Sequence, residues 1–161
     1  MKPLTPSPYT NEATPELLLR MDQAVFTDEQ IAEFDVESQA MIRQQQEYCK
    51  AHPVTGIYRL ATEGSQTRDG GVIEKTSSVV TFTLDDDQKV RGVHKGDQAI
   101  YPDGSSARII TGAGSEYSDI ALVGSRLDNG DEIINTLQWD VVLVMRKGVS
   151  MPEDFLPPVS D

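Results

Sequence analysis

The spacing of hydrophobic residues divides the chain into two parts of different character. In residues 14–52, apolar side chains recur three or four positions apart, as they do on one face of a helix. From about residue 53 they form short runs separated by Gly, Asp and Asn. The pattern therefore predicts a helical N-terminal part followed by a mainly β part with many short strands.

Two helix starts are predicted in the first part. Thr14 suits an N-cap, and Pro15 suits the first helical position that follows it. Thr27 with Gln30 fits a capping box, and we expect this second helix to continue to about Lys50. Its thin apolar stripe consists of Ile31, Phe34, Met41 and Tyr48. So narrow a stripe indicates partial burial, and packing on the chain's own β part is favoured over a dedicated partner helix.

The β part is recognised by its short apolar runs. These runs are VVTFTL, ARIIT, IALV, EIINTL and WDVVLVM. Proline-rich segments flank the two predicted parts. We therefore divide the chain into a flexible arm (1–13), a helical extension (14–52), a β domain (53–148) and an extended C-terminal tail (149–161).

Charge narrows the classes of partner. The 161 residues carry a formal net charge of −12. Binding to DNA or RNA needs Lys and Arg to neutralise phosphates, so nucleic acid is not an expected partner. An anionic membrane surface is disfavoured for the same reason. The charge favours solubility or a partner with a basic surface.

The cysteine count and the N-terminal sequence indicate the compartment. The single cysteine, Cys49, allows no intrachain disulfide, and the first residues lack the apolar stretch of a signal peptide. No apolar run approaches the roughly 20 residues of a membrane-spanning helix. We therefore expect a cytoplasmic protein without a membrane anchor, which would need another machine to leave the cell.

A segment of similar design occurs three times in the β part. In residues 60–78 and 121–138, Gly-Ser is followed at matched distances by a second glycine, an isoleucine and a threonine. Residues 93–114 form a longer middle copy. Each copy is too short to bury its own apolar face, so three copies would share one core around a pseudo-threefold axis. The turns would then converge at one end, although a β-sandwich with repetitive turns remains the alternative.

These segments resemble a PAAR-repeat domain. The closest matches to the family's pattern are GSQTRDGG and ALVGS, and the resemblance covers about residues 57–140. It implies a small β cone that forms the tip of the trimeric spike in a type VI secretion system or a related phage-tail machine. The expected partner is the trimeric spike protein, with one cone per trimer. The expected roles are membrane puncture and, through the helical extension, the carrying of an effector or adaptor.

The resemblance also implies which residues form the vertex of such a cone. The expected vertex residues are Asp69, Gly70, Tyr101, Pro102, Asp103, Gly104, Asp128, Asn129 and Gly130. Family members commonly hold a metal ion there through His and Cys, and none of these residues is either. Zinc prefers nitrogen and sulfur ligands, so we expect no metal and no other cofactor. The alternative is a hard cation, which the carboxylates and the amide could hold only if they converged. Asp and Asn side chains bonded to backbone N–H groups would hold the turns, and Tyr101 would fill the space of the metal.

The broad base of the cone is expected to follow the third copy. The apolar residues assigned to it are Trp139, Val141 and Leu143. A role for Trp139 in the core alone is an equal alternative.

No residue pattern indicates catalysis. Cys49 and His52 lie close together, but a thiol nucleophile also needs a third positioned group and an oxyanion site. The acidic run at 85–87 is typical of a solvated hairpin loop, because calcium loops place their ligands at alternate positions. We therefore expect a structural protein and not an enzyme.

The alternative is a small acidic inhibitor that neutralises a basic toxin, as an immunity-type protein does. The net charge of −12 suits that function. The acids are spread, however, with 9 acids and 4 bases in residues 1–56 and 17 and 10 in residues 57–161. An inhibitor would concentrate its acids on one face and would have no need of a threefold repeat.

Overall fold

The structure is a computed structural model that describes residues 9–23, 25–84, 86–138 and 141–157. The chain divides into two compact units, each described below by itself. The β unit comprises residues 1–12, 58–143 and 151–161, and the helical unit comprises residues 13–57 and 144–150. The sequence-based boundaries kept 144–148 with the β domain. Residues 144–150 are grouped with the helices, where the Lys147 amide N–H donates to the Pro53 carbonyl at 2.9 Å.

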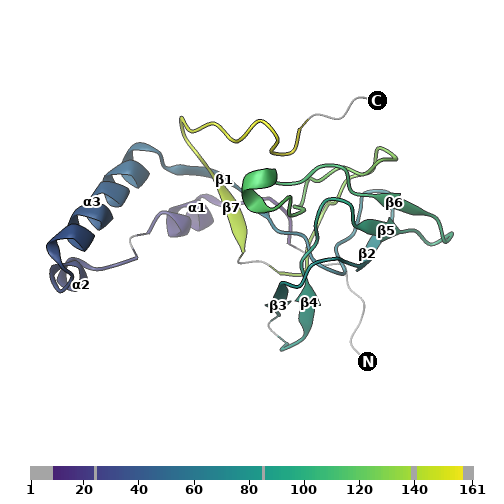
Figure 1. The fold of residues 1–161 in the computed structure, drawn as a ribbon, viewed down its shortest axis with the longest axis horizontal. Helices are drawn as coiled ribbons and strands as arrows, with labels where there is room; N and C mark the ends of the chain where they lie inside the picture. Colours follow the sequence, from purple (N-terminus) through teal and green to yellow (C-terminus); the bar gives the residue numbers. More distant parts are fainter. Residues whose placement is uncertain (1–8, 24, 85, 139–140, 158–161) are drawn as a thin grey trace. The chain divides into compact units, whose positions relative to one another are not determined.

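The helical unit contains three helices, which are labelled in Figure 1. They are α1 (Pro15–Met21), α2 (Asp28–Ala32) and α3 (Val36–Ala51). The predicted N-terminal signals are confirmed, since Thr14 caps α1 and Thr27 forms a capping box with Gln30 at the start of α2. In the part of the chain that is described, no helix is long and apolar enough to span a bilayer.

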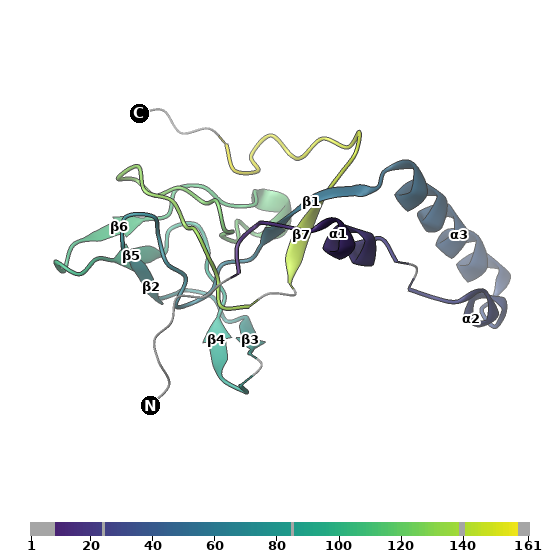
Figure 2. The same ribbon diagram turned by 180° about the vertical axis from the view of Figure 1, so that it is seen from behind.

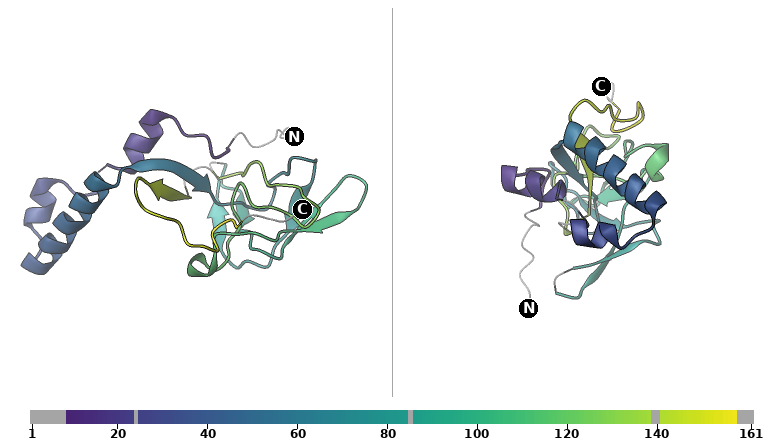
Figure 3. Two further views of the ribbon diagram at one scale, coloured as in Figure 1. Left: turned by 90° about the horizontal axis from the view of Figure 1, so that it is seen from above. Right: turned by 90° about the vertical axis from the view of Figure 1, so that its left-hand side faces the viewer.

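The prediction of one helix from residue 28 to about Lys50 is wrong. The helix is interrupted after Ala32, and Asp35 starts α3 with its carboxylate accepting from the Ser38 amide at 2.7 Å. Gln39 donates through its side-chain amide to the Phe34 carbonyl at 2.7 Å, in the link between the two helices. Figure 3 shows α2 and α3 as separate helices.

The remaining elements are short strands, as the sequence predicted. They are β1 (Val54–Arg59), β2 (Val72–Lys75), β3 (Thr81–Thr83), β4 (Lys89–Arg91), β5 (Gln98–Ile100), β6 (Ser106–Arg108) and β7 (Val142–Arg146). Among the described residues they form three small sheets, with strand orders β1-β7, β2-β5-β6 and β3-β4. The latter two are antiparallel, and the β3-β4 hairpin is seen from behind in Figure 2. A 3₁₀ turn, Ser115–Tyr117, precedes the third copy. The prediction of a mainly β domain with an α-helical extension is confirmed at this level.

Three segments of the β unit share one set of backbone hydrogen bonds. The first glycine of each segment (Gly64, Gly96 or Gly124) donates through its N–H to the carbonyl of Ile73, Ile109 or Ile133, at 2.7, 2.8 and 2.9 Å. The same isoleucines donate back to Ser65, Asp97 and Ser125, each at 2.9 Å. A side-chain oxygen of these last three residues accepts from the amide of Thr62, His94 and Leu122, at 3.0, 2.9 and 2.9 Å. The sequence repeat is therefore also a repeat of backbone geometry.

Each of the three segments pairs with both of the others. Short antiparallel pairings join the first segment to the third, the first to the second and the second to the third. The residue pairs within the segments are Leu60 with Leu122, Ile73 with Ala99, and Ile109 with Leu127. Together these pairings form a closed triangle.

The main core lies inside this triangle and is built from matched sets of residues. One set consists of Ala61, Val93 and Ala121, and another of Ile73, Ile109 and Ile133. All six are at most 1% exposed. Ala99 and Leu127 complete the cluster together with Ala107, and Tyr101 packs against it. The segments thus bury their apolar faces together, which none could do alone.

Residues at both ends of the chain are bonded to the β unit. Tyr9 pairs with Thr136, and the Asn11 side chain accepts from the Arg59 amide at 2.8 Å and donates to the Val123 carbonyl at 2.7 Å. Tyr9 and Asn11 belong to the segment 1–13, for which the sequence predicts a flexible arm. In the tail, Phe155 is buried in a second cluster with Ala113 and Leu122. The described tail residues include turns and are not simply extended.

Candidate functional site

The turn of each copy is closed in the same way. The residue three positions before the turn glycine donates its N–H to the carbonyl of the residue that follows the glycine. The glycine N–H donates back to the carbonyl of that first residue. The donor pairs are Thr67 with Gly70, Tyr101 with Gly104, and Leu127 with Gly130, and all six N···O distances lie between 2.9 and 3.1 Å. The three glycines have φ values of 94°, 86° and 86°. This left-handed conformation is one that glycine adopts without the steric cost of a side chain.

One buried carboxylate joins the three turns. Asp131, in the turn of the third copy, is 0% exposed and accepts from the Tyr101 hydroxyl of the middle copy at 2.6 Å. It also accepts from the Asp69 amide of the first copy at 3.1 Å and from the Glu132 amide at 2.7 Å. A carboxylate with these donors from three turns fixes their relative positions.

The Tyr101 ring fills the space between two of these turns. A Cβ atom built on Gly71 of the first turn would lie 3.0 Å from a carbon of the Tyr101 ring. The close approach explains why glycine occupies that position. The Tyr101 hydroxyl accepts from the Asn129 side-chain amide at 3.0 Å while it donates to Asp131. Burial, followed by the hydrogen bond to Asp131, raises the pKa of Tyr101.

The environment of Asp131 favours its ionised form. Burial alone would raise its pKa, but hydrogen bonds from Thr67, Tyr101 and the backbone outweigh that effect. The pKa of Asp131 therefore lies below its ordinary value of 3.8. The ionised carboxylate thus serves as a structural acceptor at the junction of the turns.

Three other predicted acidic and amide residues hold backbone groups. Asp103 accepts from the Ser105 amide at 2.9 Å, Asn129 from the Asp131 amide at 3.0 Å, and Asp128 from the Arg108 amide at 3.1 Å. Hydrogen bonds from Ser105 lower the pKa of the Asp103 carboxyl.

The remaining predicted residues of this group lie at its surface. Asp69 differs from the other acids, because its side chain forms an exposed ion pair with Arg68 at 3.4 Å. Arg68 also donates to the Gly130 carbonyl at 2.8 Å, which links the first turn to the third. Pro102 is exposed in the turn of the middle copy.

This group of residues does not fit a resident metal ion. No three His, Cys, Asp or Glu side chains among the described residues are arranged to hold one. The carboxylate of Asp131 already accepts from a hydroxyl and two backbone amides, and the Tyr101 ring occupies the space beside it. A cation would have to displace these donors, and the softer ligands that zinc prefers are missing from the predicted residues.

Asp131 was not among the residues predicted from the sequence. Asp131 directly follows the turn glycine of the third copy. The equivalent residues of the first and middle copies are Gly71 and Ser105, which carry no charge. An acid that directly precedes a strand with a core isoleucine was the signal that could have identified it, because such a position faces the interior.

The residues predicted for the base differ in accessibility. Trp139 lies outside the described residues. Val141 is 37% exposed, and its carbonyl accepts from the Leu60 amide at 3.2 Å. Leu143 is partly buried and packs against the cluster of Ala113, Leu122 and Phe155. Of the described pair, Val141 is therefore the better residue for testing binding.

Cys49 and His52 do not form an assembled nucleophile in the described part of the helical unit. The Cys49 sulfur is contacted by the Gln45 side-chain amide at 3.6 Å, and His52 Nδ1 lies 2.9 Å from the Lys147 carbonyl. Neither interaction joins the thiol to a base.

Comparisons with protein-family models, with curated proteins and with solved structures found no match for this chain.

Proposed function

We propose that this chain is a spike-tip protein, which caps the trimeric β-helical spike of a type VI secretion system or a related contractile machine. The observation that carries the proposal is the closed triangle of pairings among three segments with the same hydrogen bonds. Such an arrangement gives one chain approximate threefold symmetry. The proposed form of the β unit is accordingly a small PAAR-like cone.

The symmetry supports binding to a trimer. A homotrimer with a threefold axis presents three equivalent surfaces around that axis at its end. A single chain with three similar segments can contact each surface in a similar way, whereas an ordinary monomer can match one surface at a time. Strand edges at the base of the cone would extend the sheets of the spike by backbone hydrogen bonds.

The joined turns support a mechanical role. The contacts of Asp131 with the turns of the other two copies resist separation of those turns under load. In the proposed function they form the pointed end that crosses a target membrane. The protein would act without catalysis and without a cofactor, reside in the cytoplasm before firing and leave with the spike. The helical unit would carry or adapt an effector.

Stoichiometry tests the proposal directly. The chain is co-expressed with a trimeric spike protein, and the purified complex is examined by native mass spectrometry. We expect one copy of this chain on each trimer. Three copies per trimer, or no complex with any spike protein encoded beside this chain, would contradict capping by a single pseudo-symmetric chain.

A pair of variants tests the base. Val141→Glu places a charge at an accessible position of the β unit, and we expect it to prevent capping, because an unpaired charge in an interface is costly. Val25→Glu in the helical unit, at a residue 86% exposed, is the control and should cap normally. Equal capping by both variants would show that the base lies elsewhere.

The alternative proposal is an acidic inhibitor of a basic toxin. It is favoured by the net charge of −12 and by the acidic run of the helical unit described below. Tight binding to a basic nuclease or another basic toxin, with loss of the toxin's activity and without a spike, would support it. The repeated β segments then remain without a functional reason.

A further inference from the structure

The longest helix among the described residues, α3, buries none of its own residues. All 16 residues of α3 are partly or fully exposed. An isolated helix of this length is marginally stable in water, and most helices in proteins are stabilised by packing an apolar face. Within its own unit, therefore, α3 has apolar surface that a further element could cover.

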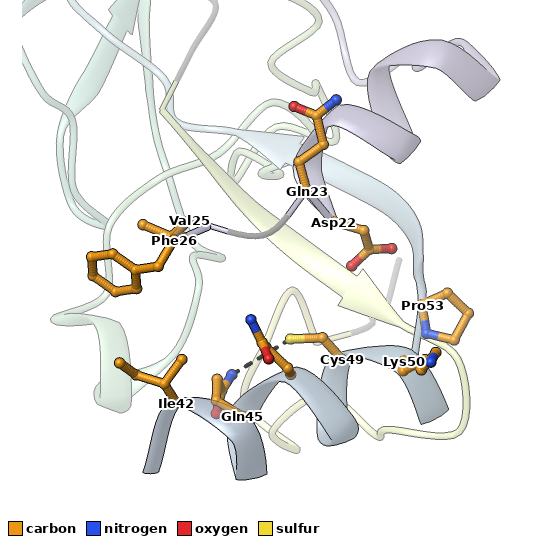
Figure 4. Close-up of a pocket in the computed structure, with 10 residues that line it drawn as sticks. Asp22, Gln23, Val25, Phe26, Ile42, Gln45, Cys49, Lys50 and Pro53 are labelled. Atoms are coloured by element: carbon orange, nitrogen blue, oxygen red, sulfur yellow. Dashed lines mark hydrogen bonds between the residues drawn. The ribbon is translucent and has the colours of Figure 1, made fainter. Parts of the chain in front are cut away.

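A groove runs along one face of this helix. It has a volume of about 590 Å³ and lies wholly within the helical unit. The residues that α3 contributes are Ile42, Gln45, Gln46, Cys49 and Lys50. These positions are spaced three or four residues apart, so they lie on a single face. Val25, Phe26 and Pro53 also line the groove, which makes it largely apolar (Figure 4).

Contacts outside the groove hold its walls in place. The Phe26 ring packs edge-on against Phe34 with 5.1 Å between centroids. Asp22 accepts from the Val54 amide at 2.7 Å and pairs with Arg146 at 2.9 Å. Asp22 and Phe26, which line the groove opposite α3, are therefore held by contacts within the helical unit before any occupant binds. A preformed site avoids the entropic cost of ordering on binding.

The segment that supplies the wall opposite α3 is strongly acidic, although Asp22 is its one acid that lines the groove itself. From residue 21 to 42 the sequence has six acids and no Lys, Arg or His. The acids are Asp22, Asp28, Glu29, Glu33, Asp35 and Glu37. This run contains the Val25 and Phe26 wall, the whole of α2 and the first turns of α3, while Lys50 lines the groove near the other end of α3. An occupant with basic residues beside its apolar face matches this distribution.

The charge also argues against a second copy of the chain as the occupant. Two chains with a net charge of −12 each would bring like charges together, and the helical segments that flank the groove are themselves acidic. Like charges at an interface disfavour association.

We propose that this groove binds an amphipathic α-helix of a partner protein, with large apolar residues on the bound face and Lys or Arg along its flanks. The apolar side chains would occupy the space beside Ile42 and Phe26. The basic flanks would face the acids of α2 and the start of α3. The proposed function assigns the carrying of an effector to the helical unit, and this groove would be the place where the effector binds. Only the description of the partner as an effector rests on the proposed function.

A pair of peptides tests the assignment on the full chain. The probe is a synthetic, end-capped peptide of about 14 residues with Leu on one face and Lys on the other. The matched control carries Glu in place of every Lys. We expect one Lys peptide to bind per chain, with an affinity at least about tenfold above that of the Glu peptide. Equal binding of the two peptides, or binding of neither, would overturn the proposal.

Neighbouring substitutions on α3 locate the binding site. Ile42→Asp places a charge in the groove and should weaken binding of the Lys peptide by about tenfold or more. Met41→Asp, one residue away at a position 70% exposed and outside the groove, should leave the affinity unchanged. Val25→Lys provides a second groove variant at a position too exposed to affect folding, and its positive charge should also weaken binding of the Lys peptide. Retention of affinity in both Ile42→Asp and Val25→Lys would overturn the assignment.

The single cysteine gives an independent readout. Cys49 lines the groove, so the bound Lys peptide should slow the labelling of its thiol by a maleimide. Unchanged labelling at saturating peptide would place the peptide elsewhere. Neither measurement uses a spike protein. If the chain caps the trimer but does not bind the Lys peptide, the groove proposal alone is rejected. If the chain binds the Lys peptide but does not cap the trimer, the spike-tip function alone is rejected.

Discussion

A single buried carboxylate, that of Asp131, links three turns of the β unit. Asp131 accepts hydrogen bonds from three turns that are far apart in the sequence, and its burial makes each of those bonds difficult to replace by water. Hydrogen bonds to a charged group are worth roughly 1.5–3 kcal/mol, about twice as much as neutral ones. The carboxylate therefore offers a test of how the turns are held together.

We expect Asp131→Asn to destabilise the protein in a pH-dependent manner. The pKa of Asp131 is lowered in the folded chain, so its contribution to stability is complete above the ordinary value of 3.8 and is lost as the pH falls below it. Asparagine lacks the charge at every pH, and its NH₂ group must face at least one of the existing donors. The difference in unfolding free energy between the two proteins should therefore be largest near pH 7 and shrink below about pH 4. Urea unfolding across this range measures it.

Tyr101→Phe tests the hydroxyl donor while the Asp131 carboxylate remains in place. This variant keeps the ring in place and removes only the hydroxyl that donates to Asp131. It should lower the free energy of unfolding by roughly 1.5–3 kcal/mol at neutral pH. Tyr117→Phe, at a tyrosine that is 38% exposed, should change stability little. For Asp131→Asn, the contrary outcome would be a difference in unfolding free energy from the unchanged protein that stays constant with pH. Such a result would contradict a role for the carboxylate charge.

At the scale of elements, local signals in the sequence were sufficient for some features and insufficient for others. The capping residues Thr14 and Thr27 were identified because each is a short-range motif with its own hydrogen bonds. The interruption before Asp35 was missed, because a second N-cap inside an otherwise continuous helical pattern carries little signal. The turn residues were found from the repeat, whereas Asp131 acts through partners some 30 and 62 residues away. Contacts of that range depend on the folded arrangement.

The repeat predicts equal costs for equivalent substitutions. Gly70→Ala, Gly104→Ala and Gly130→Ala each place a side chain at a positive φ, with open space around the new Cβ atom. The penalty therefore comes from the backbone alone, and we expect about 1 kcal/mol for each. Thermal or urea unfolding measures the three values.

Gly112→Ala is the contrasting variant for this series. Its Cβ atom would lie 2.9 Å from the carbonyl oxygens of Asp119 and Ile120. Backbone atoms cannot easily move aside, so the loss should exceed that of the three turn variants. Widely different costs for the three turn glycines would show that the turns are not equivalent.

At the scale of the whole molecule, the two units differ in how much apolar surface they bury. The β unit contains the clustered core, whereas the buried apolar residues of the helical unit are Ile31, Val54 and Ile57 among those described. Local stability follows the density of buried contacts, and regions with few of them open readily. The presence of the two parts was visible in the sequence, while the grouping of 144–150 with the helices depends on long-range pairing.

Hydrogen exchange should separate the two units. We expect the backbone amides of α3 to exchange much faster than those of Ala61, Ile73, Ala121 and Ile133, which are bonded and buried in the β unit. Binding of the Lys peptide should slow exchange in α3 and leave the β unit unchanged. Equal protection of α3 and the core amides in the free protein would contradict this difference.

The closed triangle has a consequence for how the protein is made. Leu60 must wait for Leu122 to leave the ribosome before its pairing can form, and Asn11 must wait for Val123, which is 112 positions later in the chain. Long-range pairings of this kind fold slowly, because the chain entropy is lost before the contacts reward it. Nascent chains that end before the third segment should therefore lack the β core, which would become protease-resistant only after the third segment has left the ribosome.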